Sequence, residues 1–537
     1  MRTSPTNTTQ AARAVIQKNT LDRGQRCRLI SVLPSFLIVI SEIPASCKLN
    51  FGGFSVGRRI GITNICSFSL FIILILGQFI LFSNEVKNRG ASWGGDESYY
   101  VSKAEYLAKH GVLPKADDIG MALGIKWRGT DHRPPGYPVF IALCNYPEFN
   151  IENVRWRCCV AQFVLMSVVL MILYFMACAA LKGSKWTYLA ALMFGIQPWA
   201  FEYSASIYPD SLTASITTLA LIGLFMFIKT KKSGLEMFYF LVSILLLCST
   251  FMLRAERILL VPIIAFTAVI IKSRKMKSIL KYGCYSGLIF SLFCGMQIGY
   301  RHYLTGKAEL IPKYRWSNDG AVNWVHTWFN TEKSGVEGFA FGSADKRFEK
   351  LPPRAFGDEL ERKEIKRALS LYARSGWSEE ADKIFQEVAN KRIKDNFFVN
   401  YIAPKVWRTG NLWINHETSA QLLNVVQFRP RPVRRLVIGM LSLLRLMIYL
   451  LVMTSVWTLW QHFINRNLSR NHYLTVLMLM DIFLITVFFG LVWSFNEHRY
   501  VLSAWPAMLW CAASAIIDLS TMFKKRDDEK YHREQPV

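Results

Sequence analysis

The chain has 537 residues, of which 52% are hydrophobic and 14% aromatic, and its mean hydropathy is positive. One soluble core does not need this much apolar sequence, so the composition predicts a polytopic membrane protein. The chain has 64 Lys and Arg against 38 Asp and Glu, which gives a formal charge of +26. In a membrane protein this charge favours anionic lipid or a phosphorylated substrate as partner, and we expect no nucleic-acid partner.

The first 63 residues are predicted to form a basic cytoplasmic tail. The apolar stretch 31–47 within it is broken by Pro34, Glu42 and Pro44 and is too short for a confident span. The extreme N-terminus is polar and basic, so no signal peptide is expected there.

Runs of about 20 apolar residues are long enough to cross the hydrocarbon core. About ten runs approach that length: 64–82, 158–181, 187–203, 211–229, 236–253, 257–271, 279–299, 436–459, 473–493 and 500–518. We therefore expect an all-α polytopic membrane protein.

Basic residues gather in every second connection, which by the positive-inside rule faces the cytoplasm. These connections are 182–185, 229–234, 272–281, 465–472 and the tail at 524–530. The predicted parts are an N-terminal membrane module 64–299 with its first outer loop 83–157, an outer segment 300–435, C-terminal membrane helices 436–518 and a cytoplasmic tail 519–537.

The outer segment is too polar for the bilayer. Between Asp358 and Asn396, two stretches carry apolar residues at helical spacing with a charged opposite face. They predict a small soluble helical region on the outer side.

The eleven cysteines have no metal-ligand spacing, and several fall inside apolar runs. We interpret them as small buried hydrophobic side chains instead of a disulfide framework or zinc site.

Adjacent acids, Asp96 and Glu97, follow the first span in "WGGDESYY". The next residues predict an amphipathic helix that ends at Gly111, with Tyr100 on its apolar face. A helix cap by Asp96 and a catalytic carboxylate at the membrane surface are both open interpretations. Because successive helical residues point about 100° apart, the two acids are not expected to face one substrate atom together.

Two further clusters are predicted on the outer side. "HRPPGYP" offers Arg133 and Tyr137, although a rigid lead-in to the next span also explains it. "PWAFEYSASIYPDSL" offers Tyr203 and Asp210, and Asp210 before Ser211 favours a helix cap.

Arginines mark the remaining outer clusters. Arg254 and Arg257, three residues apart, are predicted to share a helix face and to suit a phosphate, with snorkelling as the alternative. Near the last span, Glu497 and Arg499 either neutralise each other or join the site with Tyr500.

These motifs resemble the GT-C superfamily of membrane glycosyltransferases, especially the branch with dolichyl-phosphate-mannose protein mannosyltransferases and ArnT-like transferases. The resemblance rests on "GGDESYYVSKAEYLAKHGVL", "HRPPGYPVFIAL", "YSASIYPDSL" and "NEHRY". It covers the first half and the extreme C-terminal part, whereas 300–435 matches only loosely.

The resemblance implies an inverting transferase that takes a sugar from a polyprenyl phosphate in the membrane and gives it to a protein, lipid or glycan hydroxyl at the outer face. It further implies a bacterial inner membrane with a periplasmic site. Asp96 resembles the catalytic acid and Glu97 its neighbour. The expected phosphate contacts are Arg133, Arg254, Arg257 and Arg499, and the expected substrate contacts are Tyr100, Tyr137, Tyr203, Asp210, Glu497 and Tyr500.

Two questions stay open at the level of sequence. A divalent cation held by Asp96, Glu97 and Asp210 is compatible with their carboxylates, but spacing does not decide it, and no cofactor is certain. A transporter or flippase of polyprenyl-linked sugars is the alternative function; it would place functional charge in mid-span, where Asp481 is the main example.

Overall fold

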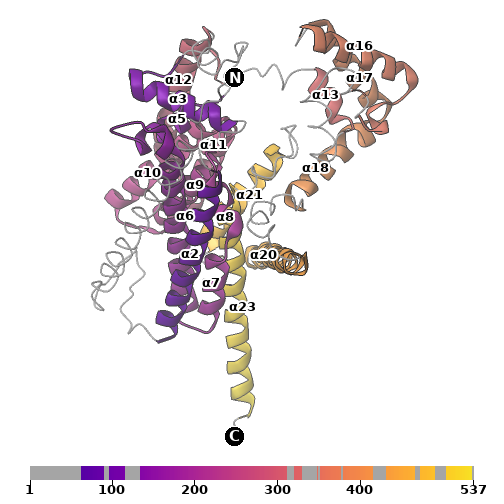
Figure 1. Ribbon diagram of the computed structural model, residues 1–537. Helices are drawn as coiled ribbons and strands as arrows, with labels where there is room; N and C mark the ends of the chain where they lie inside the picture. The colour runs from indigo at the N-terminus through magenta and orange to yellow at the C-terminus, as the bar shows by residue number, and fades with distance from the viewer. Residues whose placement is uncertain are drawn as a thin grey trace, which may run out of the picture. The chain divides into compact units, whose positions relative to one another are not determined.

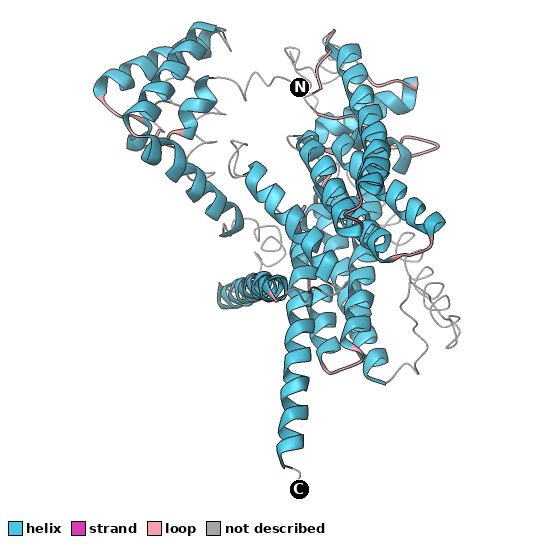
Figure 2. Cartoon of the chain, turned by 180° about the vertical axis from the view of Figure 1, so that it is seen from behind, coloured by secondary structure: helices cyan, strands magenta, loops and turns pink. Residues whose placement is uncertain are grey.

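The computed structural model describes residues 62–89, 96–114, 133–306, 308–310, 320–328, 348, 351–375, 379–414, 431–465, 468, 472–489 and 503–534. Its elements up to residue 305 are α2 (Ile62–Arg89), α3 (Asp96–His110), α5 (Gly136–Cys144), α6 (Ile151–Leu181), α7 (Trp186–Gly195), α8 (Pro198–Glu202), η1 (Tyr203–Ala205), α9 (Asp210–Lys229), α10 (Ser233–Leu253), η2 (Ala255–Leu259), α11 (Leu260–Lys272) and α12 (Met276–Thr305). The later elements are α13 (Gly320–His326), η3 (Pro353–Ala355), α16 (Glu359–Ser375), α17 (Glu379–Asp395), the π-helical turn η4 (Phe398–Ile402), α18 (Ala403–Ile414), α20 (Arg431–Ile464), α21 (His472–Val487) and α23 (Trp505–Glu534). In the described part of the chain every regular element is a helix (Figure 2), which confirms the predicted all-α membrane fold.

Seven helices are long and apolar enough to cross a membrane: α2, α6, α9, α10, α12, α20 and α23. The predicted count of about ten is not confirmed. The other three predicted spans are represented by α7, α11 and α21, which have 10, 13 and 16 residues and fall short of the roughly 20 that a helix needs.

One of these short helices, α7, nevertheless belongs to a passage that runs the length of the bundle. A Cβ on Gly183 would lie 3.3 Å from Asn64 at the start of α2, and Ser206 accepts a 2.7 Å hydrogen bond from Arg89 at the end of α2. The chain between these points includes α7 and then non-helical or short helical turns. Helix length alone therefore undercounts the traverses, because irregular backbone is tolerated where protein surrounds it.

The bundle has two distinguishable ends. Lys272 at the end of α11 donates a 3.1 Å hydrogen bond to the Phe227 carbonyl near the end of α9, and we call the end with Asn64 and Lys272 the basic end. Arg254 pairs with Asp210 at the start of α9, and we call the end with Arg89 and Asp210 the carboxylate end. The basic connections 182–185, 229–234 and 272–281 thus share one end, as predicted.

Close helix contacts hold the bundle together. Figure 1 shows α6, α7, α9 and α23 alongside one another, and each of α6 and α7 contacts α23. The hydroxyls of Ser67 and Tyr174 lie 2.9 Å apart, and the Phe71 ring stacks on Tyr174 at 4.7 Å. Small residues and aromatic stacking allow tight packing in lipid, where helices gain little from the hydrophobic effect.

The polar segment after α12 contains a separate helical core. Trp324, Ile365 and Phe385 are buried there between α13, α16 and α17. Arg392 donates hydrogen bonds of 2.9 Å to Glu361 and 2.8 Å to the Ala355 carbonyl. This confirms the two predicted helices in 358–396. Among the described cysteines, Cys158, Cys159, Cys248 and Cys511 are buried as predicted, whereas Cys66 and Cys284 are exposed, contrary to the prediction of buried side chains.

Candidate functional site

The two adjacent acids at the start of α3 have different environments. Glu97 is buried and accepts two hydrogen bonds of 2.9 Å from Arg155 on α6, and a third of 3.0 Å from the Ile207 backbone N–H. Its oxygens are therefore engaged by the protein. The roughly 100° between successive helical side chains accounts for this separation from Asp96.

Asp96 is the accessible member of the pair. Its side chain is 32% exposed and forms an ion pair with Arg133, whose guanidinium lies over the faces of Tyr99 and Tyr100 at 4.4 and 5.3 Å from the ring centroids. Asp96 is itself the first residue of α3. Arg133 comes just before α5, so a contact between two separate segments fixes the direction of the carboxylate.

Asp210 is paired with an arginine from another element. It is the first residue of α9, Pro209 precedes it, and the start of α9 has no side-chain cap hydrogen bond, so the cap interpretation is wrong. The Asp210 Oδ1 atom accepts from Arg254, which also pairs with Glu256. The Oδ2 atom is buried and accepts no hydrogen bond from the described residues, which leaves it available to a donor on a bound molecule.

Arg254 and Arg257 do not share a helix face, contrary to the sequence prediction. Helix α10 ends at Leu253, and Arg254 has extended backbone angles before η2 begins. Arg257 instead turns to Asp481 on α21, at 3.1 Å, and to the Ser503 hydroxyl. With 1% of its side chain exposed, Arg257 ties α21 to η2 and lies away from solvent.

Two of the predicted aromatic residues, Tyr100 and Tyr137, pack against each other. Tyr100 and Tyr137 meet edge to face, with ring centroids 5.0 Å apart, and Tyr137 is fully buried. Tyr203 lies in η1, beside Ser206 and Ile207 in the chain. Arg499, Glu497 and Tyr500 lie outside the described residues.

Two basic residues that sequence reasoning missed complete this end of the bundle. Arg155 holds Glu97, and Lys103 on α3 donates a 2.8 Å hydrogen bond to the Tyr300 hydroxyl on α12. Burial, together with repulsion from Arg133 and Arg301, holds the pKa of Lys103 well below its usual value. The signal was present in the sequence, since Lys103 lies between Tyr100 and Ala104 on the predicted apolar face.

The arrangement suits an anion better than a metal ion. Each of Asp96, Glu97 and Asp210 faces a guanidinium, whose positive charge opposes a cation at the same oxygens. Among the described residues these three acids do not form a group with metal-ligand spacing.

Comparison with known proteins supports the resemblance seen in the sequence. Residues 132–297 match the sequence model of the dolichyl-phosphate-mannose-protein mannosyltransferase family. The match covers less than half of the chain; it includes Arg133, Asp210 and Arg254 and begins after Asp96. A search of curated proteins finds no significant match.

Among solved structures, the apo oligosaccharyltransferase of Archaeoglobus fulgidus aligns with a TM-score of 0.42 at 13% identity. The alignment covers 87% of this chain and 52% of that one, so this chain spans about half the length of the oligosaccharyltransferase. The chain is thus an integral membrane protein whose described elements are helical, and it resembles the mannosyltransferase family over residues 132–297, from α5 to most of α12.

Proposed function

We propose that the protein is a glycosyltransferase that moves a sugar from a polyprenyl phosphate to an acceptor hydroxyl, with Asp96 as the general base. The observation that carries the proposal is the different environment of the two adjacent acids, since Glu97 is enclosed by Arg155 whereas Asp96 remains partly exposed. The family match over residues 132–297 supports the reaction class.

The proposed reaction uses the two ion pairs at the carboxylate end, Asp96 with Arg133 and Asp210 with Arg254. The acceptor oxygen attacks the anomeric carbon while the bond from that carbon to the phosphate oxygen breaks, and the polyprenyl phosphate leaves with the electron pair. Asp96 takes the hydroxyl proton late in this step, because a carboxylate is too weak to remove it beforehand. Attack opposite the leaving group inverts the anomeric configuration.

Fixed guanidinium groups stabilise the charge that develops on the leaving phosphate without having to reorganise. Arg133 and Arg254 are the arginines for this role, because both lie with a carboxylate at the same end of the bundle and keep 11% and 10% of their side chains exposed. The buried Arg257 would support them from behind. The tyrosines and Asp210 Oδ2 would contact the sugar or acceptor.

Sidedness follows from charge. The carboxylate end is opposite the basic connections, and by the positive-inside rule this supports a site at the outer face. We propose that this face is the periplasmic side of a bacterial inner membrane. A polyprenyl tail can then stay in the bilayer while its phosphate reaches the site.

The test measures sugar transfer by the purified full-length protein in detergent, with polyprenyl-phosphate [³H]mannose as donor and a membrane extract as acceptor. We expect Asp96→Asn to lower transfer about 10²- to 10⁴-fold, the usual contribution of a general base. Glu105→Gln is the matched control, because Glu105 also lies on α3, is paired with Lys109 and is 35% exposed. We expect it to retain wild-type transfer.

Wild-type transfer by a folded Asp96→Asn protein would exclude Asp96 as the base. If the wild-type protein transfers no sugar but carries the labelled lipid across the membrane of reconstituted vesicles, the transporter alternative holds and the proposed reaction is wrong.

A further inference from the structure

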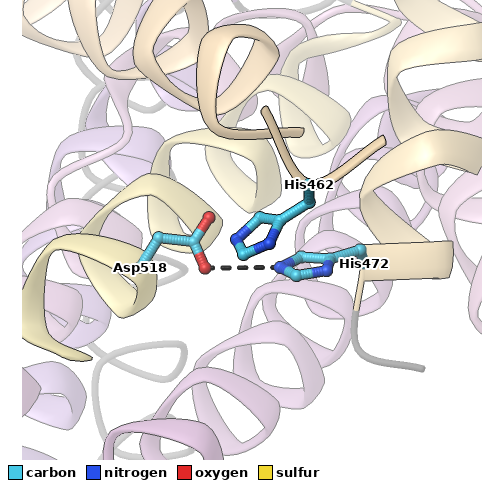
Figure 3. Close-up of side chains that lie close together, drawn as sticks. All are labelled: His462, His472 and Asp518. Atoms are coloured by element: carbon cyan, nitrogen blue, oxygen red, sulfur yellow. Dashed lines mark hydrogen bonds and ion pairs between the residues drawn. The ribbon is translucent and has the colours of Figure 1, made fainter. Parts of the chain in front are cut away.

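Two histidines and an aspartate from three helices meet at one point of the bundle. His462 lies near the end of α20, His472 is the first residue of α21, and Asp518 lies in α23. One ligand atom of each lies within 4.8 Å of the other two. Figure 3 shows the two imidazole rings beside the carboxylate, with the His472 Nε2 atom 3.4 Å from Asp518 Oδ1.

This cluster is separate from the acid and arginine pairs. Asp518 follows Trp505, at the start of α23, by 13 residues, which is about 20 Å of helix. Five residues beyond Asp518, Phe523 stacks on Trp186, next to the basic connection 182–185. The cluster therefore lies toward the basic end, whereas Asp96 and Asp210 lie at the carboxylate end.

A simple hydrogen bond between His472 and Asp518 is the alternative explanation of the cluster, but it does not require His462. Yet the His462 and His472 rings pack 4.3 Å apart, with 31° between their planes. The chain has only nine histidines, so two of them side by side at a carboxylate are a specific arrangement.

We propose that His462, His472 and Asp518 bind a zinc ion that fastens α20 to α21 and α23. Two imidazole nitrogens and a carboxylate oxygen are a ligand set that zinc accepts, with water as the fourth ligand. Zn–N and Zn–O bonds of about 2.1 Å place ligand atoms about 3.4 Å apart, so the present spacing closes by small side-chain rotations.

Supporting contacts already orient the carboxylate. Thr458 on α20 donates a 2.9 Å hydrogen bond to Asp518 Oδ2, which leaves Oδ1 facing the rings. Metal ligands are commonly held by such outer hydrogen bonds. His462 and Asp518 are partly exposed, so protein does not fully enclose the cluster.

The role follows from the packing of α20. Within the described residues only 17% of the apolar window of this helix is buried, and the helix packs mainly against α23. A zinc ion at residue 462 would anchor its end to two other helices. Because the cluster lies apart from the acid and arginine pairs, the ion takes no part in sugar transfer.

The experiment uses full-length protein purified without a polyhistidine tag and measures bound zinc by mass spectrometry after dialysis. We expect about one zinc per chain, and a melting temperature that falls when a chelator removes it. His462→Phe should lose the zinc, whereas His462→Cys should keep it because a thiolate is also a zinc ligand. Thr458→Val should weaken binding about tenfold.

His302→Phe is the matched control, since His302 is exposed on α12, and it should bind zinc like the wild-type protein. Equal zinc in the wild-type and His462→Phe proteins would overturn the proposal, as would a melting temperature of the chelator-treated wild-type protein that added zinc does not raise. If His462→Phe does not fold, titration of the wild-type protein with Co²⁺ decides, because a tetrahedral site gives intense visible absorption and its absence contradicts the site.

Discussion

Arg155 donates two hydrogen bonds of 2.9 Å to Glu97, and both side chains are less than a tenth exposed. Removing one partner of such a buried pair leaves an uncompensated charge, which costs about 3 to 5 kcal/mol. We expect Arg155→Met to lower the melting temperature of the detergent-solubilised protein strongly. The double variant Arg155→Met with Glu97→Gln should recover much of the loss, because Gln still accepts from Ile207. Equal stability of the single and double variants would contradict a mutual pairing.

Arg133 combines charge with stacking on two tyrosines, which a lysine does not reproduce. We expect Arg133→Lys to lower sugar transfer about tenfold and Arg133→Met about a hundredfold, since the second change removes the charge as well. Rates measured over a range of donor concentrations check this. Equal rates for the two variants would show that charge at this position has no role.

Gly136, at the start of α5, lies against the end of α10. A Cβ there would come within 2.5 Å of the Met252 carbonyl oxygen, close to both Arg133 and Arg254 in the chain. Since backbone cannot yield as a flexible side chain does, Gly136→Ala should destabilise the protein by about 1 to 3 kcal/mol and reduce transfer. Gly77→Ala on α2 meets nothing within 4 Å and should leave both unchanged. Melting temperatures and transfer rates of the two variants test the contact.

His326, on α13, should make the helical region of α13, α16 and α17 sensitive to acid. Burial and the positive charges of Arg408 and Lys405 hold its pKa well below the usual 6.5. The unfolded chain takes up a proton as pH falls below about 6.5 while folded His326 stays neutral, so stability is full above that pH and decreases below it. Limited proteolysis at pH about 5 and about 8, with cleavage within 320–328 and 351–395 identified by mass spectrometry, should show faster cleavage in acid.

The His326→Phe variant provides the control for this pH effect. We expect its cleavage to depend less on pH than that of the wild-type protein, since Phe takes up no proton. The same pH dependence in both proteins would assign the effect to other groups.

The order of helices followed from the sequence to a large extent. Apolar runs located all seven long helices, and helical spacing located α3, α16 and α17, because burying an apolar face requires those periods. The apolar run 187–203 predicted one spanning helix, but α7 ends at Gly195 and the chain continues through short turns inside the bundle. The hydropathy of such a run does not show where the helix ends.

The roles of individual charges depended on tertiary contacts. The sequence singled out Asp96, Asp210 and Arg254, because charged residues next to membrane spans are costly and tend to be functional. It predicted a cap for Asp210, and only the approach of Arg254, 44 residues away, shows an ion pair instead. The preference of a residue for a helix cap depends on the few residues around it, whereas its ion-pair partner depends on which helices become neighbours in the fold.

The sequence by itself thus determined an all-helical membrane protein with its polar clusters, since hydrophobicity and helical periodicity are properties of neighbouring residues. Only the tertiary structure paired Asp96 with Arg133 and Glu97 with Arg155, and brought His462, His472 and Asp518 together. Asp96 and Arg133 are 37 residues apart in the sequence, and Glu97 and Arg155 are 58 residues apart. The histidine cluster draws its residues from three helices. Contacts between residues so far apart in the chain depend on how whole helices pack.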